Sequence, residues 1–180
     1  LIAFFLLIIF GVSCSSSTKK EAKQEPAKPA IESPESVKPA PKKDGITDEN
    51  VEEKLLEYGK NHPETIAKIT TSKGIITIRL FKDTPLHRAN FIMLANAGYF
   101  DSTVFSRAVP NFMAQAGSGF NGRHTDLKIK LGSYTIPAEF SQHHFHKKGA
   151  VGMARNYEDN PDKRSNPYAF YFVEGSIFSH

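Results

Sequence analysis

Two short segments in the middle of the chain have the pattern of apolar residues that is typical of β-strands. Ile76, Ile78 and Leu80 alternate with polar side chains in the segment 74–81, which predicts a strand with one buried and one wetter face. The β-rich segment 66–71 precedes it, and the three residues between the two segments end in a glycine. This arrangement predicts a β-hairpin.

The segment 84–97 has the start and stop signals of a helix. Thr84 can act as the N-cap, Pro85 stands at the first helical position, and Gly98 follows the end. Proline at the start and glycine past the end are typical of helix termini. The residues of its core-facing stripe are Phe91, Leu94 and Ala95.

A shorter helix is expected within residues 47–63. Thr47 can cap it, acids fill its first turn, and Gly59 with Pro63 marks its exit. Its apolar residues fall on one face, which we expect to pack on the outside of the globular domain. A helix that binds a partner is the alternative. The apolar residues are Val51, Leu55 and Tyr58.

Polar composition predicts surface loops at residues 120–131 and 157–166, and strand character returns at 168–173. The crowded His143, His144 and His146 lack a spacing that would converge on one ion, so we expect exposed loop histidines and no metal. The chain carries a net charge of +4. It has no interleaved stripe of arginine and aromatic residues outside the predicted strands, so no nucleic-acid partner is expected.

The first ten residues are an unbroken apolar run. Ten residues make about 15 Å of helix, roughly half of a bilayer core, so a signal peptide over residues 1–13, cut short at its start, is the better interpretation. Cys14, the one cysteine, follows small residues and resembles the lipidation site of a bacterial lipoprotein, although Gly11 stands where leucine is usual. An ordinary secretory signal with an incidental cysteine is the alternative.

Residues 14–46 are predicted to be the lipidated cysteine and, after it, a disordered tether. They are rich in Lys, Glu, Pro, Ala and Ser and nearly lack large apolar residues, so burial cannot offset the entropy of ordering them. A flexible chain of this length spans on the order of 30 Å. The remainder of the 180 residues, with 39% hydrophobic residues overall, suits one globular domain.

The chemistry concentrates in residues 105–117. In an extended chain Phe105 and Arg107 share one face, as do Met113 and Gln115 beyond the turn at Pro110-Asn111. The stretch holds no nucleophile–base pair, carboxylate pair or set of metal ligands. A site here would therefore work by shape and hydrogen bonding.

The pattern Phe-x-Arg-x-x-Pro-x-Phe-Met-x-Gln-x-Gly resembles the signature of the cyclophilin-type peptidyl-prolyl cis-trans isomerases. Similar segments flank it from about residue 66 to residue 175. The resemblance implies a mainly all-β fold over residues 64–180, an antiparallel closed barrel with a capping helix at 84–97. The barrel is expected to be incomplete at its C-terminal end, because further family strands would follow residue 180.

The resemblance also implies roles for individual residues. Arg107, Phe112 and Gln115 match the catalytic set. Substrate-binding positions are matched by Phe105, Met113, Ala154, Arg155 and Tyr171. Three departures from the family pattern are Tyr171 where Phe is common, Arg155 where Asn is frequent, and Ala169 where Gln often lines the groove.

The implied activity is rotation about X-Pro peptide bonds without a cofactor, in a monomer that binds proline-containing polypeptides and assists the folding of exported proteins. The expected location is the bacterial cell envelope, with a lipid anchor in the membrane. Two rival interpretations remain open. One is a proline-binding or chaperone-like lipoprotein without catalysis, and the other is a structural envelope lipoprotein.

Overall fold

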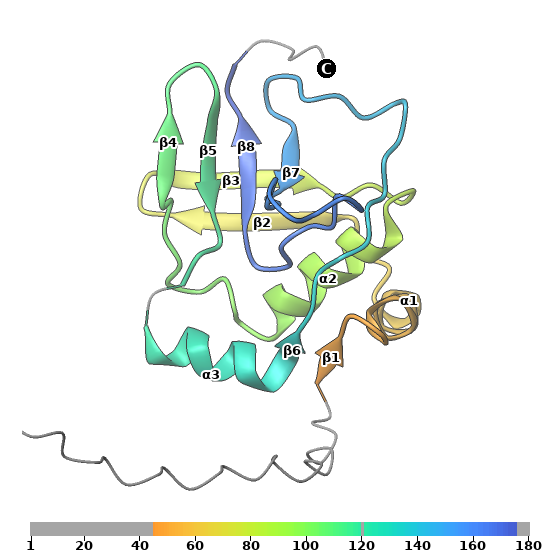
Figure 1. Cartoon of the computed structure of the whole chain (residues 1–180). Helices are drawn as coiled ribbons and strands as arrows, with labels where there is room; N and C mark the ends of the chain where they lie inside the picture. The colour runs from red at the N-terminus through yellow and green to blue at the C-terminus, as the bar shows by residue number, and fades with distance from the viewer. Residues whose placement is uncertain (1–44, 120, 176–180) are drawn as a thin grey trace, which may run out of the picture. The chain divides into compact units, whose positions relative to one another are not determined.

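The computed structural model describes residues 45–119 and 121–175. The predictions of a signal peptide, a lipidated Cys14 and nearly all of the tether lie outside the described residues. The described part contains three helices and eight strands (Figure 1). In chain order they are β1 Ile46–Thr47, α1 Val51–Asn61, β2 Ile66–Thr71, β3 Gly74–Arg79, α2 Pro85–Asn96, β4 Arg107–Val109, β5 Met113–Ala116, α3 Gly122–Leu131, β6 Gly132–Ser133, β7 Val151–Met153 and β8 Phe170–Val173.

The described strands form three sheets and no closed barrel. β1 pairs with β6 in parallel, β2 pairs with β3 as an antiparallel hairpin, and the third sheet has the order β4-β5-β8-β7. The helices are 11, 12 and 10 residues long. The predicted hairpin is confirmed. The described strands do not confirm the predicted mainly all-β closed barrel.

One hydrophobic core lies between the hairpin β2–β3 and the four-stranded sheet. Ile78 of β3, Phe91 of α2 and Phe170 of β8 are buried in it together with Ala116 of β5. Because side chains alternate along a strand, the packing of the buried Phe170 and the partly buried Phe172 on this side turns Tyr171 to the opposite face of the sheet. The core therefore decides which residues of β8 can reach a ligand.

Helix α2 is confirmed, but its start is stabilised by a different group from the predicted one. The Thr84 side chain makes no capping hydrogen bond. Instead the Glu139 carboxylate accepts hydrogen bonds from the backbone N–H groups of Leu86 and His87, each at 2.9 Å. A carboxylate at this end satisfies unpaired N–H groups and complements the helix dipole.

Glu139 also joins a second interaction, with the side chain of His87. Its Oε2 lies 2.6 Å from His87 Nδ1, and His87 Nε2 lies 3.0 Å from Ser165 Oγ. The order Ser–His–Glu resembles a hydrolytic triad. However, Ser165 is buried, and its backbone N–H and C=O are both hydrogen-bonded to Ile136. The row therefore joins three segments of the fold.

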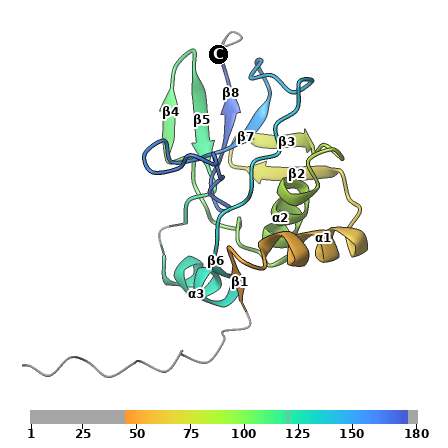
Figure 2. The same cartoon turned by 45° about the vertical axis from the view of Figure 1, so that its right-hand side comes forward.

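Helix α1 packs against α2, and the two helices lie side by side in both Figure 1 and Figure 2. Its Val51 and Leu55 are buried beside Leu86 and Ala89 of α2, which confirms the prediction that this face packs on the domain. The predicted cap Thr47 is wrong, because the helix begins at Val51, after Asn50.

Residues 122–131 form helix α3, where the sequence predicted a surface loop. The Asn121 side chain caps it by accepting a hydrogen bond from the backbone N–H of His124 at 3.2 Å. His124 is fully buried against Tyr99. The helix is anchored mainly by this polar residue, so no apolar period announces it in the sequence.

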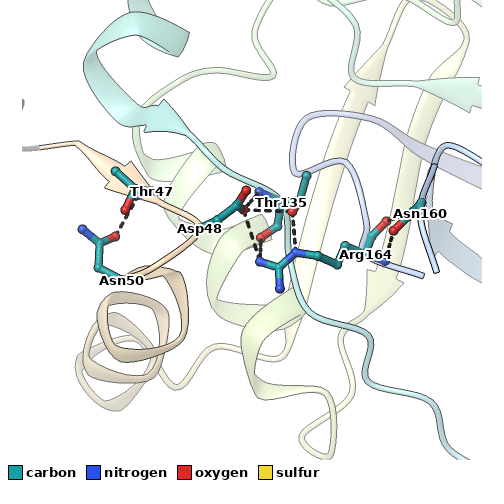
Figure 3. Close-up of polar contacts among 6 residues, drawn as sticks. All are labelled: Thr47, Asp48, Asn50, Thr135, Asn160 and Arg164. Atoms are coloured by element: carbon teal, nitrogen blue, oxygen red, sulfur yellow. Dashed lines mark hydrogen bonds and ion pairs between the residues drawn. The ribbon is translucent and has the colours of Figure 1, made fainter. Parts of the chain in front are cut away.

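A polar cluster ties the residues before α1 to two later loops (Figure 3). Asp48 Oδ1 accepts hydrogen bonds from Thr135 N at 2.6 Å, Thr135 Oγ1 at 2.9 Å and Arg164 Nη2 at 3.2 Å. Partial burial alone would raise the pKa of the Asp48 carboxyl. The hydrogen bonds from Thr135 and the charge of Arg164 outweigh it and hold that pKa below its ordinary value.

Replacing Asp48 should therefore lower stability in a pH-dependent way. A carboxyl whose pKa is depressed on folding stabilises the protein above its unfolded pKa, and this stabilisation disappears as the pH falls through the folded pKa. We expect Asp48→Asn to cost about 0.5–1 kcal/mol at neutral pH, because Asp48 is largely exposed to solvent.

Urea unfolding of the wild type and the variant at a series of pH values measures the effect. Asp126→Asn is the matched control, since no hydrogen bond or ion pair joins the Asp126 side chain to the other described residues. A constant difference between wild type and Asp48→Asn down to strongly acidic pH would contradict the assignment.

Candidate functional site

The central motif forms a β-hairpin that carries its polar residues on one face. β4 and β5 pair so that Arg107 stands opposite Gln115. Residue 111 of the predicted turn has a φ of +58°, a conformation that asparagine tolerates better than most residues, and Phe112 N donates to Val109 O at 3.1 Å. The predicted hairpin and turn are confirmed.

The register extends this face across the sheet. Gln115 stands opposite Tyr171 of β8, which stands opposite Gly152 of β7. Residues directly opposite each other share a face. The structure therefore lines up Arg107, Gln115 and Tyr171 on the face that points away from the core, and the strands that carry them lie side by side in Figure 1.

Two polar side chains at this face have no partner within the described part of the chain. Arg107 is exposed and Gln115 half-buried, and neither side chain makes a hydrogen bond or ion pair with another described residue. Five guanidinium donors and one amide are thus available to a ligand.

Apolar residues of the motif border this polar row. Met113 lies two residues before Gln115, on the same face, and is buried. Phe112 is 41% exposed at the end of the hairpin turn, and its carbonyl accepts a hydrogen bond from Glu174 N at 2.9 Å. Phe112 and Met113 therefore give a small apolar surface beside the polar donors.

Phe105 lies against Phe172, with ring centroids 6.0 Å apart, and Phe172 packs on the core side of the sheet. The expectation that Phe105 shares the face of Arg107 is therefore wrong, because the chain does not stay extended between the two residues.

Tyr171 is held in place by His146, for which the sequence predicted only an exposed position in a loop. Its hydroxyl lies 2.7 Å from His146 Nε2, and the two rings stack with an interplanar angle of 8°. Burial raises the pKa of the Tyr171 hydroxyl, the neighbouring Tyr157 adds to the rise, and Arg155 opposes it. The tyrosine is therefore held in its neutral, hydrogen-bonding form at neutral pH.

Only a residue without a side chain fits beneath this tyrosine. A Cβ atom on Gly152 would lie 2.7 Å from both Cζ and the hydroxyl of Tyr171, well inside van der Waals contact. The backbone of Gly152 is not in the left-handed region, so close approach, and not conformation, requires the glycine.

The histidine cluster is less exposed than the sequence predicted. Among the described residues no group of three or more potential ligands could hold a metal ion. His143 is exposed, whereas His146 binds Tyr171 and His144 stacks on Phe81 at 3.8 Å and pairs with Asp83 at 2.9 Å. The side chains of His144 and His146 are held by residues that lie far away in the sequence. The local sequence pattern could not reveal these partners.

Comparison with known proteins places these features in one family. The family described as cyclophilin type peptidyl-prolyl cis-trans isomerase/CLD matches residues 66–176, well over half of the chain. The chain belongs to this family. The matched range contains every residue of the row formed by Arg107, Gln115 and Tyr171.

Curated relatives of the cyclophilin domain include bacterial and fungal proteins. A peptidyl-prolyl cis-trans isomerase of Acinetobacter baylyi is 30% identical over 116 residues, which cover 64% of this chain and 58% of that protein. The peptidyl-prolyl isomerase CWC27 of Mycosarcoma maydis is 33% identical over 109 residues, or 60% of this chain and 21% of that protein. The chain thus spans less than two thirds of the length of either relative.

Solved structures include a cyclophilin type peptidyl-prolyl cis-trans isomerase of Cryptosporidium parvum, crystallised with the dipeptide Ala-Pro. It is 21% identical, with a TM-score of 0.48, and the match covers 62% of this chain and 68% of that chain.

The end of β7 shows which part of the cyclophilin motif leaves its backbone available. Ala154 N donates to Ala169 O at 2.9 Å, and Ala154 O accepts from Asn166 N at 2.7 Å. Both backbone groups of Ala154 are therefore used within the domain. Arg155 makes no such hydrogen bond with other described residues, so its backbone, and not that of Ala154, can pair with a peptide.

Replacing Gly152 with alanine should displace Tyr171 and break its bond to His146. Overpacking of this kind costs about 1–3 kcal/mol, and we expect Gly152→Ala to lower the urea midpoint accordingly. Gly122→Ala is the control, because a Cβ at Gly122 meets no atom within 4 Å.

A double-mutant cycle tests the cause of this loss. In a Tyr171→Ala background the clash is absent, so Gly152→Ala should then cost little. An equal cost in both backgrounds would rule out Tyr171 as the reason for the glycine.

Proposed function

We propose that this cyclophilin domain accelerates cis-trans rotation about X-Pro peptide bonds. One observation carries the proposal. Arg107, Gln115 and Tyr171 stand directly opposite one another on the outward face of three adjacent strands, with the apolar Met113 beside them. Membership in the cyclophilin family and the names of the curated isomerase relatives support the same reaction.

The reaction requires a group that binds a twisted amide better than a planar one. The barrier is about 18–20 kcal/mol, because rotation removes the resonance of the amide. Twisting localises a lone pair on the prolyl nitrogen, and a hydrogen-bond donor aimed at that nitrogen lowers the barrier. No bond is broken, so neither a nucleophile nor a cofactor is needed.

Arg107 is the residue that suits this role. Its guanidinium stays charged and presents donors in a rigid fork, and its position opposite Gln115 lets the amide side chain orient either the arginine or the substrate carbonyl. Phe112, Met113 and Tyr171 supply the apolar surface for the proline ring. The backbone of Arg155 then holds the neighbouring part of the peptide.

A non-catalytic proline-binding domain is the second candidate. Ala169 is buried, and its carbonyl accepts a hydrogen bond from Ala154. It offers no side-chain donor where the family often has glutamine. The loss of this group would weaken catalysis more than binding if the glutamine acts on the twisted amide.

We also propose that the hairpin β2–β3 and the four-stranded sheet are parts of one antiparallel barrel. The shared core of Ile78, Phe91, Ala116 and Phe170 supports this arrangement. The closed, mainly all-β barrel itself stays a prediction.

For the cellular setting we propose a monomer that is exported and anchored in the bacterial envelope through a lipid on Cys14, with residues 15–44 as the tether. The predicted tether ended at residue 46, but Ile46 is buried in the core and belongs to β1. Exported polypeptides that contain proline are then the substrates. The apolar run before the lone cysteine supports this proposal. No helix in the described part of the chain is long and apolar enough to cross a membrane.

Arg107→Ala should lower kcat and kcat/KM together, because its strongest hydrogen bond exists only in the twisted state. Loss of one such donor costs about a hundredfold or more in rate. Exchange of a short X-Pro peptide, followed by NMR or a coupled protease, measures it. Arg107→Lys should not restore activity, because an ammonium lacks the fork.

Two further variants define this result. Phe112→Ala should mainly raise KM, by about tenfold, since apolar burial serves planar and twisted substrate alike. Arg79→Ala, at an exposed strand position in the other hairpin, should leave exchange unchanged. Turnover near the wild-type rate in a folded Arg107→Ala variant would refute the mechanism, whereas peptide binding without acceleration in the wild type would favour the binding domain.

Cys14→Ala should release the protein from the membrane fraction of the producing bacterium. Stable anchoring needs two or more acyl chains, and all of them depend on this cysteine. Fractionation and metabolic labelling with a fatty acid provide the measurement, and Ser13→Ala is the control. Continued sedimentation of the Cys14→Ala variant with membranes would reject the lipid anchor.

A further inference from the structure

An arginine makes cation–π contacts with two exposed aromatic rings beside the proposed groove. The Arg155 guanidinium carbon is 5.2 Å from the centroid of the Tyr157 ring and 5.8 Å from that of Phe140. Lys163 Nζ is 5.6 Å from the same Phe140 ring. Phe140 and Tyr157 are 73% and 85% exposed, so packing of the core does not explain them.

Neither cation of this cluster is neutralised within the described residues. The ion pairs found there involve other side chains, and no carboxylate lies within pairing distance of Arg155 or Lys163. Yet Arg155 is only half exposed. A partly desolvated guanidinium without an acid is costly unless a ligand supplies the opposite charge.

The cluster is continuous with the groove. Arg155 follows Gly152 by three residues, and Gly152 stands opposite Tyr171. The charge of Arg155 also acts on the pKa of the Tyr171 hydroxyl, which it lowers against the larger effect of burial. Because the Arg155 backbone has no partner among the described residues, a peptide held there would have a side chain close to the guanidinium.

We propose that Arg155 determines substrate specificity by binding an acidic side chain next to the X-Pro bond. Cation–π contact with the rings of Tyr157 and Phe140 restrains the guanidinium, and no other described residue uses its N–H donors, so they can bind a carboxylate in a bidentate manner. Lys163 adds a second positive charge. The proposal rests on the proposed function in taking an X-Pro peptide as the ligand of the groove.

The test compares two peptides that differ only in charge, Ala-Glu-Pro-Phe and Ala-Gln-Pro-Phe. Titration followed by NMR chemical shifts gives the affinity of each for the full chain. We expect the glutamate peptide to bind about five- to tenfold more tightly, with a preference that falls as salt is added, because partly exposed charge pairs are screened.

Arg155→Gln should bring the ratio of the two affinities close to one, whatever its effect on both peptides together. Arg155→Lys should keep part of the preference, because the charge remains and the fork is lost. Arg79→Gln removes the same charge elsewhere and should leave the ratio as it is in the wild type. Equal affinities in the wild type, no binding of either peptide, or a preference that survives in Arg155→Gln would each overturn the proposal.

Cis-trans exchange measured in the same samples separates this proposal from the proposed function. A glutamate preference that depends on Arg155 without accelerated exchange would support the acidic subsite and reject the isomerase. Accelerated exchange without any glutamate preference would support the isomerase and reject the acidic subsite.

Discussion

The packing of Phe170 is the constraint on which the arrangement of the site depends. Its ring centroid lies 5.4 Å from those of both Phe91 and Phe100, and truncation of such a buried phenylalanine typically costs about 3–5 kcal/mol. Because the side chains of a strand alternate, this burial directs Tyr171 outward. The pairing of β8 with β5 and of β5 with β4 then brings Gln115 and Arg107 into the same row. A core contact thus determines a functional surface.

The elements that could be predicted are those that are specified by residues close together in the sequence. The hairpin of residues 66–81 and helix α2 follow from alternation, proline and glycine, all read within a few residues. Helix α3 could not be predicted in this way, because a buried histidine and an asparagine cap hold it without an apolar stripe. The capping of α2 was also hidden, since Glu139 lies more than fifty residues beyond the helix start. The number of sheets also depends on which strands pair, and these strands lie far apart in the sequence.

The same division applies to the site. The motif of residues 105–117 predicted that Arg107 and Gln115 belong together, because both lie in one hairpin. It could not predict that His146 bonds to the Tyr171 hydroxyl, that Gly152 makes room for that ring, or that Arg155 contacts the rings of Phe140 and Tyr157. These contacts join three separate segments, and only the fold determines which of them meet.

The row of Glu139, His87 and Ser165 has a consequence for cooperativity. Both oxygens of one carboxylate serve the start of α2, and through His87 the same helix holds Ser165, whose backbone is paired with Ile136. Opening of the loop that carries Ile136 and Glu139 therefore exposes N–H groups at the start of the helix. Opening of the loop around residue 165 leaves the backbone groups of Ile136 and the His87 side chain without their partner. Helix and loops should exchange their amide hydrogens as one unit of local unfolding. The segment that leads from Ser165 to Tyr171 thereby shares in the stability of α2.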